Sequence, residues 1–264
     1  MFDDSLSSAQ RKLAWGVEGV KTLQAEADSY RGRQAYVFDT EREARSPHEV
    51  QFRCFATEIE APPDHWPLAA GDAIQNIRSA LDHCVWAAWK VANPNAADGN
   101  HTQFLLLTDP DDWKRQKRRL EGVPEPVRAL VKRSQPYNRW QQAPASDTLA
   151  ILARLSNSDK HRALRVVAAA VMFEMVGVPD GVKLEQWKPA TGKRLGEGRA
   201  EVASFVAVSN REFDPMQVSP DFTYDVTIEG MSLDMLKGFV HDVFEIVVEA
   251  ETGSRPHPFA TYPL

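Results

Sequence analysis

The chain has 264 residues, with 31 Lys and Arg against 37 Asp and Glu, and a formal net charge of −6 at pH 7. Hydrophobic residues make up 43% and charged residues 26%, which is typical of a globular protein and excludes an intrinsically disordered chain. The sequence has neither an apolar run of membrane-spanning length nor the basic and apolar regions of a secretory signal. Cys54 and Cys84 lack metal-binding spacing, which favours buried thiols in a reducing compartment. We therefore expect a cytoplasmic protein.

The first two thirds of the chain are predicted to be mainly helical. Apolar residues at three- and four-residue spacing predict a helix over 7–31, and the strongest helical pattern runs over 67–93. Between them, the alternation of Val50, Phe52 and Cys54 predicts a β-hairpin with strands over 35–40 and 49–60. Further helices are predicted over 110–120, 124–133 and from a cap at Ser146 or Asp147 to about residue 162.

The character of the sequence changes after residue 164. Alternating segments over 182–188, 201–209 and 222–229 predict a small antiparallel sheet of three or four strands. A last amphipathic helix follows over 231–251, with Ser232 as its cap.

These elements predict an α+β fold that is mainly α and forms one intertwined domain over residues 1–264. The predicted helical bundle combines about 7–31, 67–93, 110–162 and 231–251, with the N-terminal hairpin and a β-insertion at about 165–229 placed before the last helix. An independent C-terminal module at about 165–252 is the alternative.

The helix over 67–93 carries unusual polarity within an apolar pattern. At about 100° per residue, its polar stripe falls within roughly 60° of the helix surface. The stripe consists of Asp72, Asn76, Ser79 and His83. Arg78 and Asp82, four residues apart on a neighbouring stripe, are spaced to pair. Because burying an unsatisfied polar group costs about 1–3 kcal/mol, the stripe indicates either a structural hydrogen-bond network or a reactive pocket.

A second polar cluster lies at the end of the helix that starts near residue 147. It contains Asp159, Lys160, His161 and Arg162. A solvated helix end is one interpretation, since cations in the last turn interact favourably with the helix dipole. The other is a contact with the first cluster, in which Asp159 faces Arg78 or His161 lies beside His83.

Two sequence blocks carry a family resemblance. GDAIQNIRSALDHCVWAAW, followed downstream by LARLSNSDKHRAL, resembles a family of uncharacterised bacterial and phage proteins with similar blocks. The first block also resembles the helix of HEPN-type domains, all-α bundles that include metal-independent ribonucleases with an Arg-x4-6-His motif. Arg78 and His83 fit that motif, although Ser79 stands where the family commonly has Asn, His or Asp. Arg42 with His48 and Arg154 with His161 share the spacing, but the former pair lies in a predicted hairpin loop.

The resemblance implies a homodimeric endoribonuclease of the toxin or phage-defence type, without a cofactor. In this hypothesis His83 transfers protons at the ribose 2′-oxygen and Arg78 stabilises the phosphate. Asp72, Asn76, Ser79, Asp82 and the Asp159–Arg162 cluster support them. RNA is the expected partner, together with a neutralising antitoxin or another protein. Because Arg78 and His83 lie about 140° apart on the helix, a dimer cleft would have to contact both flanks.

A run of basic residues after residue 113 is a candidate RNA-binding surface. Its cations are Lys114, Arg115, Lys117, Arg118 and Arg119. They are suited to holding phosphates, whereas a solvated helix face is the other interpretation.

Two further functions compete with the ribonuclease. One is a non-catalytic binding module in which the two polar clusters form a buried structural network. The other is a metal-dependent hydrolase, whose ligands would come from Asp72, Asp82, His83, Asp159 and His161, although the spacing of these residues matches no familiar metal motif.

Overall fold

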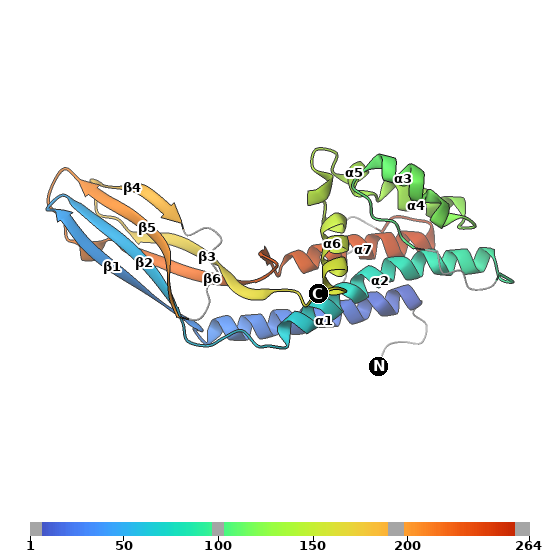
Figure 1. Ribbon diagram of the computed structural model, residues 1–264, viewed down its shortest axis with the longest axis horizontal. Coiled ribbons are helices and arrows are strands. Elements are labelled where there is room, and N and C mark those ends of the chain that lie inside the picture. Colours follow the sequence, from blue (N-terminus) through green and yellow to red (C-terminus); the bar gives the residue numbers. More distant parts are fainter. Residues whose placement is uncertain (1–6, 97–102, 190–197, 257–264) are drawn as a thin grey trace. The chain divides into compact units, whose positions relative to one another are not determined.

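The computed structural model describes residues 7–96, 103–189 and 198–256 of the chain (Figure 1). The fold is α+β, and the chain forms two compact units, each built from segments that are not contiguous in sequence. The first unit comprises Met1–Gln24, Pro67–Leu164 and Leu233–Leu264, and the second comprises Ala25–Trp66 and Arg165–Ser232. Among the described residues, no helix combines the length and apolar character that crossing a membrane requires.

The helices follow the periodicity of the sequence closely. They are α1 (Ser8–Gly32), α2 (Trp66–Ala92), α3 (Pro110–Gln116), α4 (Glu125–Arg133), α5 (Pro136–Arg139), α6 (Thr148–Asp159) and α7 (Met235–Thr252), with 3₁₀ turns η1 (Lys117–Leu120) and η2 (Pro144–Ser146). Asp109 caps α3 by accepting the Asp111 N–H at 2.8 Å, and Asp147 caps α6 by accepting the Leu149 N–H at 2.9 Å. These side chains satisfy backbone donors that the first helical turn leaves unpaired.

The start of α7 differs from the prediction. Ser232 was expected to cap this helix, but it belongs to the short strand β7 (Met231–Ser232), where it pairs with Thr227. The helix begins three residues later, at Met235. Because Ser232 is part of β7, it does not take the N-cap position of α7.

Within the first unit, α1 and α2 approach each other closely at Gly16. A Cβ atom at this position would lie 3.1 Å from the Ile77 backbone N and 3.2 Å from the Ala73 carbonyl O. Only a residue without a side chain permits this spacing. Large apolar side chains on both sides of the contact are buried, among them Leu13, Val17, Ile74, Ile77 and Leu81. This packing buries the apolar face of α2. The polar stripe of α2 is not part of this apolar contact.

The second unit contains two antiparallel sheets (Figure 1). One has the order β1-β2-β5-β4, and the other has the order β3-β6-β7. The strands are β1 (Tyr36–Ser46), β2 (Glu49–Glu58), β3 (Val166–Gly177), β4 (Val182–Pro189), β5 (Arg199–Ser209), β6 (Ser219–Ile228) and β7. Phe52 of β2 lies opposite Phe205 of β5, and their rings stack with centroids 4.8 Å apart.

The pairing of β2 with β5 changes the predicted organisation in two ways. The hairpin and the insertion were expected to be separate, with one small sheet in the insertion, but the insertion divides between two sheets. In addition, the hairpin lies in the same compact unit as the insertion. The physical reason is that the apolar face of β2, with Val50 and Phe52 buried, is matched by the buried Ala207 and Phe205 of β5, which lie opposite them.

Candidate functional site

The predicted basic run borders a groove in the first unit. Its volume is about 1050 Å³, and α3, η1 and α4 contribute most of its walls. The lining residues are Trp113, Lys114, Arg115, Lys117, Arg118, Leu120, Glu121, Glu125, Arg128, Ala129, Lys132, Arg133 and Asn138. Of the predicted RNA-binding residues only Arg119 is not part of the lining, and its guanidinium lies 3.4 Å from the Gln103 side-chain oxygen.

The groove is strongly positive although the whole chain is acidic. Seven of its lining side chains are Lys or Arg and two are Glu. Four of the seven cations have carboxylate partners, in the pairs Lys114–Asp111, Arg115–Asp112, Arg128–Glu125 and Arg133–Glu249. Asp111 lies 2.6 Å from Lys114 and raises the pKa of this amine by hydrogen bonding to its charged form.

The other three cations of the groove are Lys117, Arg118 and Lys132. Within the part of the chain that the structure describes, none of them forms an ion pair or a side-chain hydrogen bond. Their charges are therefore available to a bound anion without the loss of an ion pair.

The predicted RNA-binding residues form only one wall of this groove. The wall formed by α4 was not predicted, although Arg128 and Lys132 are four residues apart and so share a helix face. This spacing was readable in the sequence. That this face borders the same groove as Lys114–Arg118 was not readable, since it depends on the turn between η1 and α4.

The proposed catalytic arginine is part of a structural network. Arg78 donates to Asp82 at 2.8 Å and to the carbonyl O of Phe104 at 2.7 Å, and Asp82 also accepts the Phe104 N–H at 2.9 Å. The Arg78 side chain is only 14% exposed. Two side chains of α2 thus hold both polar groups of one residue in a neighbouring segment, and the ring of Phe104 is buried in the core.

His83 directly follows Asp82 on α2, but its environment is different. Its Nδ1 is buried and has no hydrogen-bond partner among the described residues, although the residue as a whole is only half-buried. Burial lowers the pKa of His83 by disfavouring the protonated ring, and the nearby charge of Lys12 acts in the same direction against the opposing effect of Asp82. The imidazole is therefore neutral at pH 7, as a general base must be.

The rest of the predicted stripe makes mostly local contacts. The Asn76 side chain donates to the Asp72 carbonyl at 2.9 Å and accepts from Lys12 of α1 at 3.1 Å. The Asp72 side chain is exposed, and Ser79 is half-buried.

The second cluster meets α2 one turn away from the predicted place. Asp159 lies 3.4 Å from the Gln75 side-chain nitrogen, and a Cβ at Gly71 would overlap its carboxylate. Gln75 also donates to the Ser156 carbonyl at 2.6 Å and accepts from the Ser156 hydroxyl at 2.9 Å. The predicted contact between Asp159 and Arg78 is thus replaced by one with Gln75, because Asp82 and Phe104 already occupy the guanidinium of Arg78.

The remaining members of this cluster lie at the surface. Lys160, His161 and Arg162 are exposed, so His161 is not paired with the half-buried His83. The described residues contain no group of three or more His, Cys, Asp or Glu placed to hold a metal ion. The ligand set of the predicted metal hydrolase is therefore not assembled in this part of the chain.

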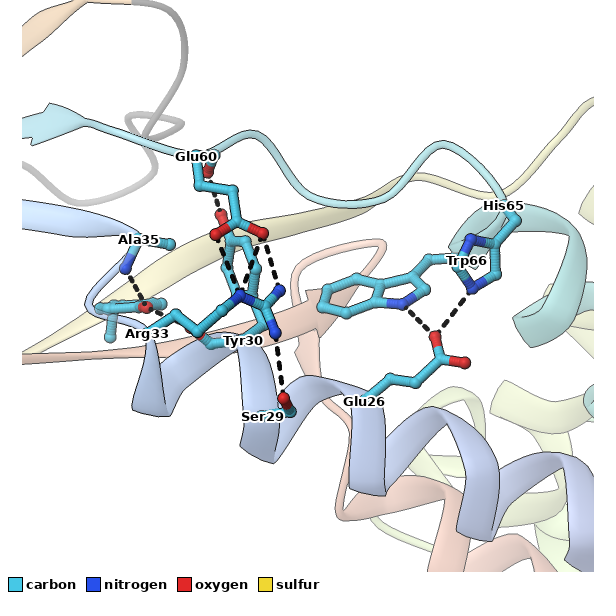
Figure 2. Close-up of polar contacts among 9 residues, drawn as sticks. Glu26, Ser29, Tyr30, Arg33, Ala35, Glu60, His65 and Trp66 are labelled. Carbon is cyan, nitrogen blue, oxygen red and sulfur yellow. Dashed lines mark hydrogen bonds and ion pairs between the residues drawn. The ribbon is translucent and has the colours of Figure 1, made fainter.

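A polar cluster in the second unit was not predicted. Near the end of α1, one carboxylate oxygen of Glu26 accepts hydrogen bonds from His65 Nε2 and from the indole N–H of Trp66, both at 2.7 Å (Figure 2). The Trp66 side chain is fully buried, whereas that of His65 is 60% exposed. No spacing pattern relates Glu26 to residues 40 positions away, so sequence analysis could not find this contact.

The same part of α1 is fixed at a second point (Figure 2). The Tyr30 hydroxyl donates to the Glu60 carbonyl at 2.6 Å, and the Glu60 carboxylate pairs with Arg33 at 2.7 Å. Each polar group of these two contacts belongs to α1, to Arg33 directly after it, or to the segment after β2. Their arrangement therefore holds the end of α1 against this segment.

We expect the Glu26 contact to stabilise the fold in a pH-dependent way. The hydrogen bonds from His65 and then Trp66 lower the pKa of Glu26 below its ordinary value of 4.5. The contact therefore contributes stability above pH 4.5 and loses it as the pH falls through the lowered pKa of the folded state. Replacing Glu26 with Ala should cost about 1–3 kcal/mol at neutral pH, since the buried indole N–H then has no acceptor.

Urea unfolding of wild type and Glu26→Ala at neutral pH and at a pH well below 4.5 measures this effect. Glu26→Gln is the matched control, because its amide oxygen can still accept from Trp66, and it should lose less stability. A stability difference between wild type and Glu26→Ala that does not shrink in acid would contradict the assignment.

Comparison of the chain with protein-family models, with curated proteins and with solved structures gives no match.

Proposed function

We propose that the chain binds RNA through its phosphate backbone, along the groove between α3, η1 and α4. The observation that supports this function is the set of three groove cations without acidic partners, Lys117, Arg118 and Lys132. Three unpaired cations in one groove repel one another. Among the described residues, none of them forms an ion pair or a side-chain hydrogen bond that would stabilise the fold. A polyanion relieves this repulsion, and it also releases condensed counterions from the nucleic acid.

The paired cations of the groove support the same function. Asp111, Asp112 and Glu125 each lie three residues before their partner on the same helix. Such exposed pairs are worth little, typically less than about 1 kcal/mol, so a phosphate can replace the carboxylate at small cost. The groove thus combines unpaired cations with paired cations that become available on binding.

Ribonuclease activity is a second candidate, and His83 favours it. A neutral, half-buried imidazole on a long helix is suited to proton transfer, as the HEPN resemblance implies. The hydrogen bonds of Arg78 favour the structural alternative. The Arg78 guanidinium would have to leave Asp82 and Phe104 to reach a phosphate. The HEPN-like bundle, the homodimer and a neutralising antitoxin stay predictions.

Fluorescence anisotropy of labelled RNA with the full chain tests the proposed binding. We expect saturable binding at low salt whose affinity falls steeply as salt is added, since counterion release drives it. Gel analysis of the same samples, without added metal, reports cleavage separately. Absence of binding at low salt would overturn the proposed function, whereas binding without cleavage would favour the non-catalytic module.

A further inference from the structure

We infer that the groove selects single-stranded over double-stranded nucleic acid, and that Trp113 makes this selection by stacking on a base. The inference rests on the proposed function and adds a ligand class and a specificity-determining residue to it. It is based on the position and the contacts of Trp113, which charge alone does not explain.

Trp113 is the aromatic side chain of the groove lining. It lies in α3 directly before Lys114 and Arg115, and it is half-buried. Among the described residues its ring stacks on no other ring, lies under no cation, and its indole N–H forms no hydrogen bond. Tryptophan at a packed position usually has a partner for its N–H. Trp113 thus offers both an aromatic surface and a free donor to whatever occupies the groove.

Stacking on an aromatic side chain is a property that distinguishes single strands from duplexes. In a duplex the bases already stack on one another, and an A-form RNA helix exposes mainly phosphates and 2′-hydroxyls. A single strand can turn its bases toward the protein, so that one base stacks on an indole while cations follow the backbone. Trp113 beside Lys117 and Arg118 provides both parts of this arrangement on one helical segment.

The ion pairs of the groove predict how salt should affect binding. Lys117, Arg118 and Lys132 neutralise phosphates without breaking a pair, whereas the paired cations exchange one anion for another. With three effective contacts, the slope of log affinity against log salt is about −2 for a single strand. A fourfold increase in salt should then weaken binding about 16-fold.

The test compares a short oligouridine with an RNA duplex of the same length, using the full chain. Wild type should prefer the single strand by about tenfold, in the range that one stacked base provides. Trp113→Leu should lose this preference by weakening binding of the single strand, with little change for the duplex. Trp113→Phe, which retains an aromatic ring, should keep most of the preference for the single strand. Trp15→Leu removes an exposed Trp of α1 that lies outside the groove and should leave both affinities unchanged.

Each outcome decides between the inference and the proposed function. Equal affinity of wild type for both RNAs, or an equal loss for both in Trp113→Leu, would overturn the role of Trp113 while leaving the groove as a phosphate site. Absence of binding to either RNA would overturn the proposed function itself. Thermal melting of each variant shows whether a loss of affinity comes from unfolding.

Discussion

Reversing the charge of Lys117 and Lys132 together should weaken RNA binding by about 100-fold or more at low salt. Each substitution to Glu removes a cation that has no acidic partner and places a carboxylate where a phosphate would lie. Like charges brought together at an interface cost several kcal/mol, and about 2.7 kcal/mol is sufficient for a 100-fold loss. The salt dependence of any residual binding should also become shallower.

Lys183→Glu with Lys188→Glu is the matched control for this experiment. Both residues are exposed on β4, in the second unit, and their reversal changes the net charge by the same amount. Anisotropy titrations should show little change for this variant. Because Lys117 and Lys132 are exposed, the groove variant should keep its melting temperature. Equal losses in both variants would show that net charge, and not the groove, governs binding.

Replacing Arg78 with Ala should destabilise the first unit by about 2 kcal/mol, because it removes a hydrogen-bonded ion pair with Asp82 and the donor to Phe104. This loss corresponds to a decrease of roughly 4–8 °C in melting temperature. Arg78→Lys keeps the charge but lacks the second arm of the guanidinium, so its stability should be intermediate. Differential scanning calorimetry measures all three proteins.

His83→Ala separates the structural and catalytic interpretations of the same helix. We expect little loss of stability, since the buried Nδ1 has no partner to lose. Because the pKa of His83 is lowered in the folded state, protonation favours unfolding, and the wild type should lose stability as the pH falls below 6.5. His83→Ala should lack this contribution.

The Arg78→Ala variant has one decisive outcome. If it kept its full stability and abolished RNA cleavage, Arg78 would be catalytic and the structural interpretation would fail.

The helices and their ends were the part of the fold most accessible from sequence. Pro110 after Asp109 begins α3, and Asp147 caps α6, because capping depends on residues only two or three positions apart. The basic run was likewise visible as a run. The strand β1 was predicted too short, since its second half is exposed and its charged side chains resemble a loop.

The candidate site was predictable only where its residues are neighbours in the chain. Arg78 and Asp82 pair as their spacing predicts, but their shared partner Phe104 lies more than 20 residues away. Similarly, Asp159 meets Gln75, since Gly71 lets α6 approach α2 one turn before Arg78. Such contacts depend on how two helices cross, and a helical period does not contain this information.

The sequence by itself determined the local features of this protein: the long helices, the caps, the alternating strands and the positive run that forms one wall of the groove. The tertiary structure decided which polar groups meet, that β2 pairs with β5, and that the face of α4 with Lys132 borders the same groove as Lys117 and Arg118. The physical reason is range. Helix caps and side-chain spacing act over a few residues, whereas the groove and the Arg78 network exist only after distant segments have packed around a common core.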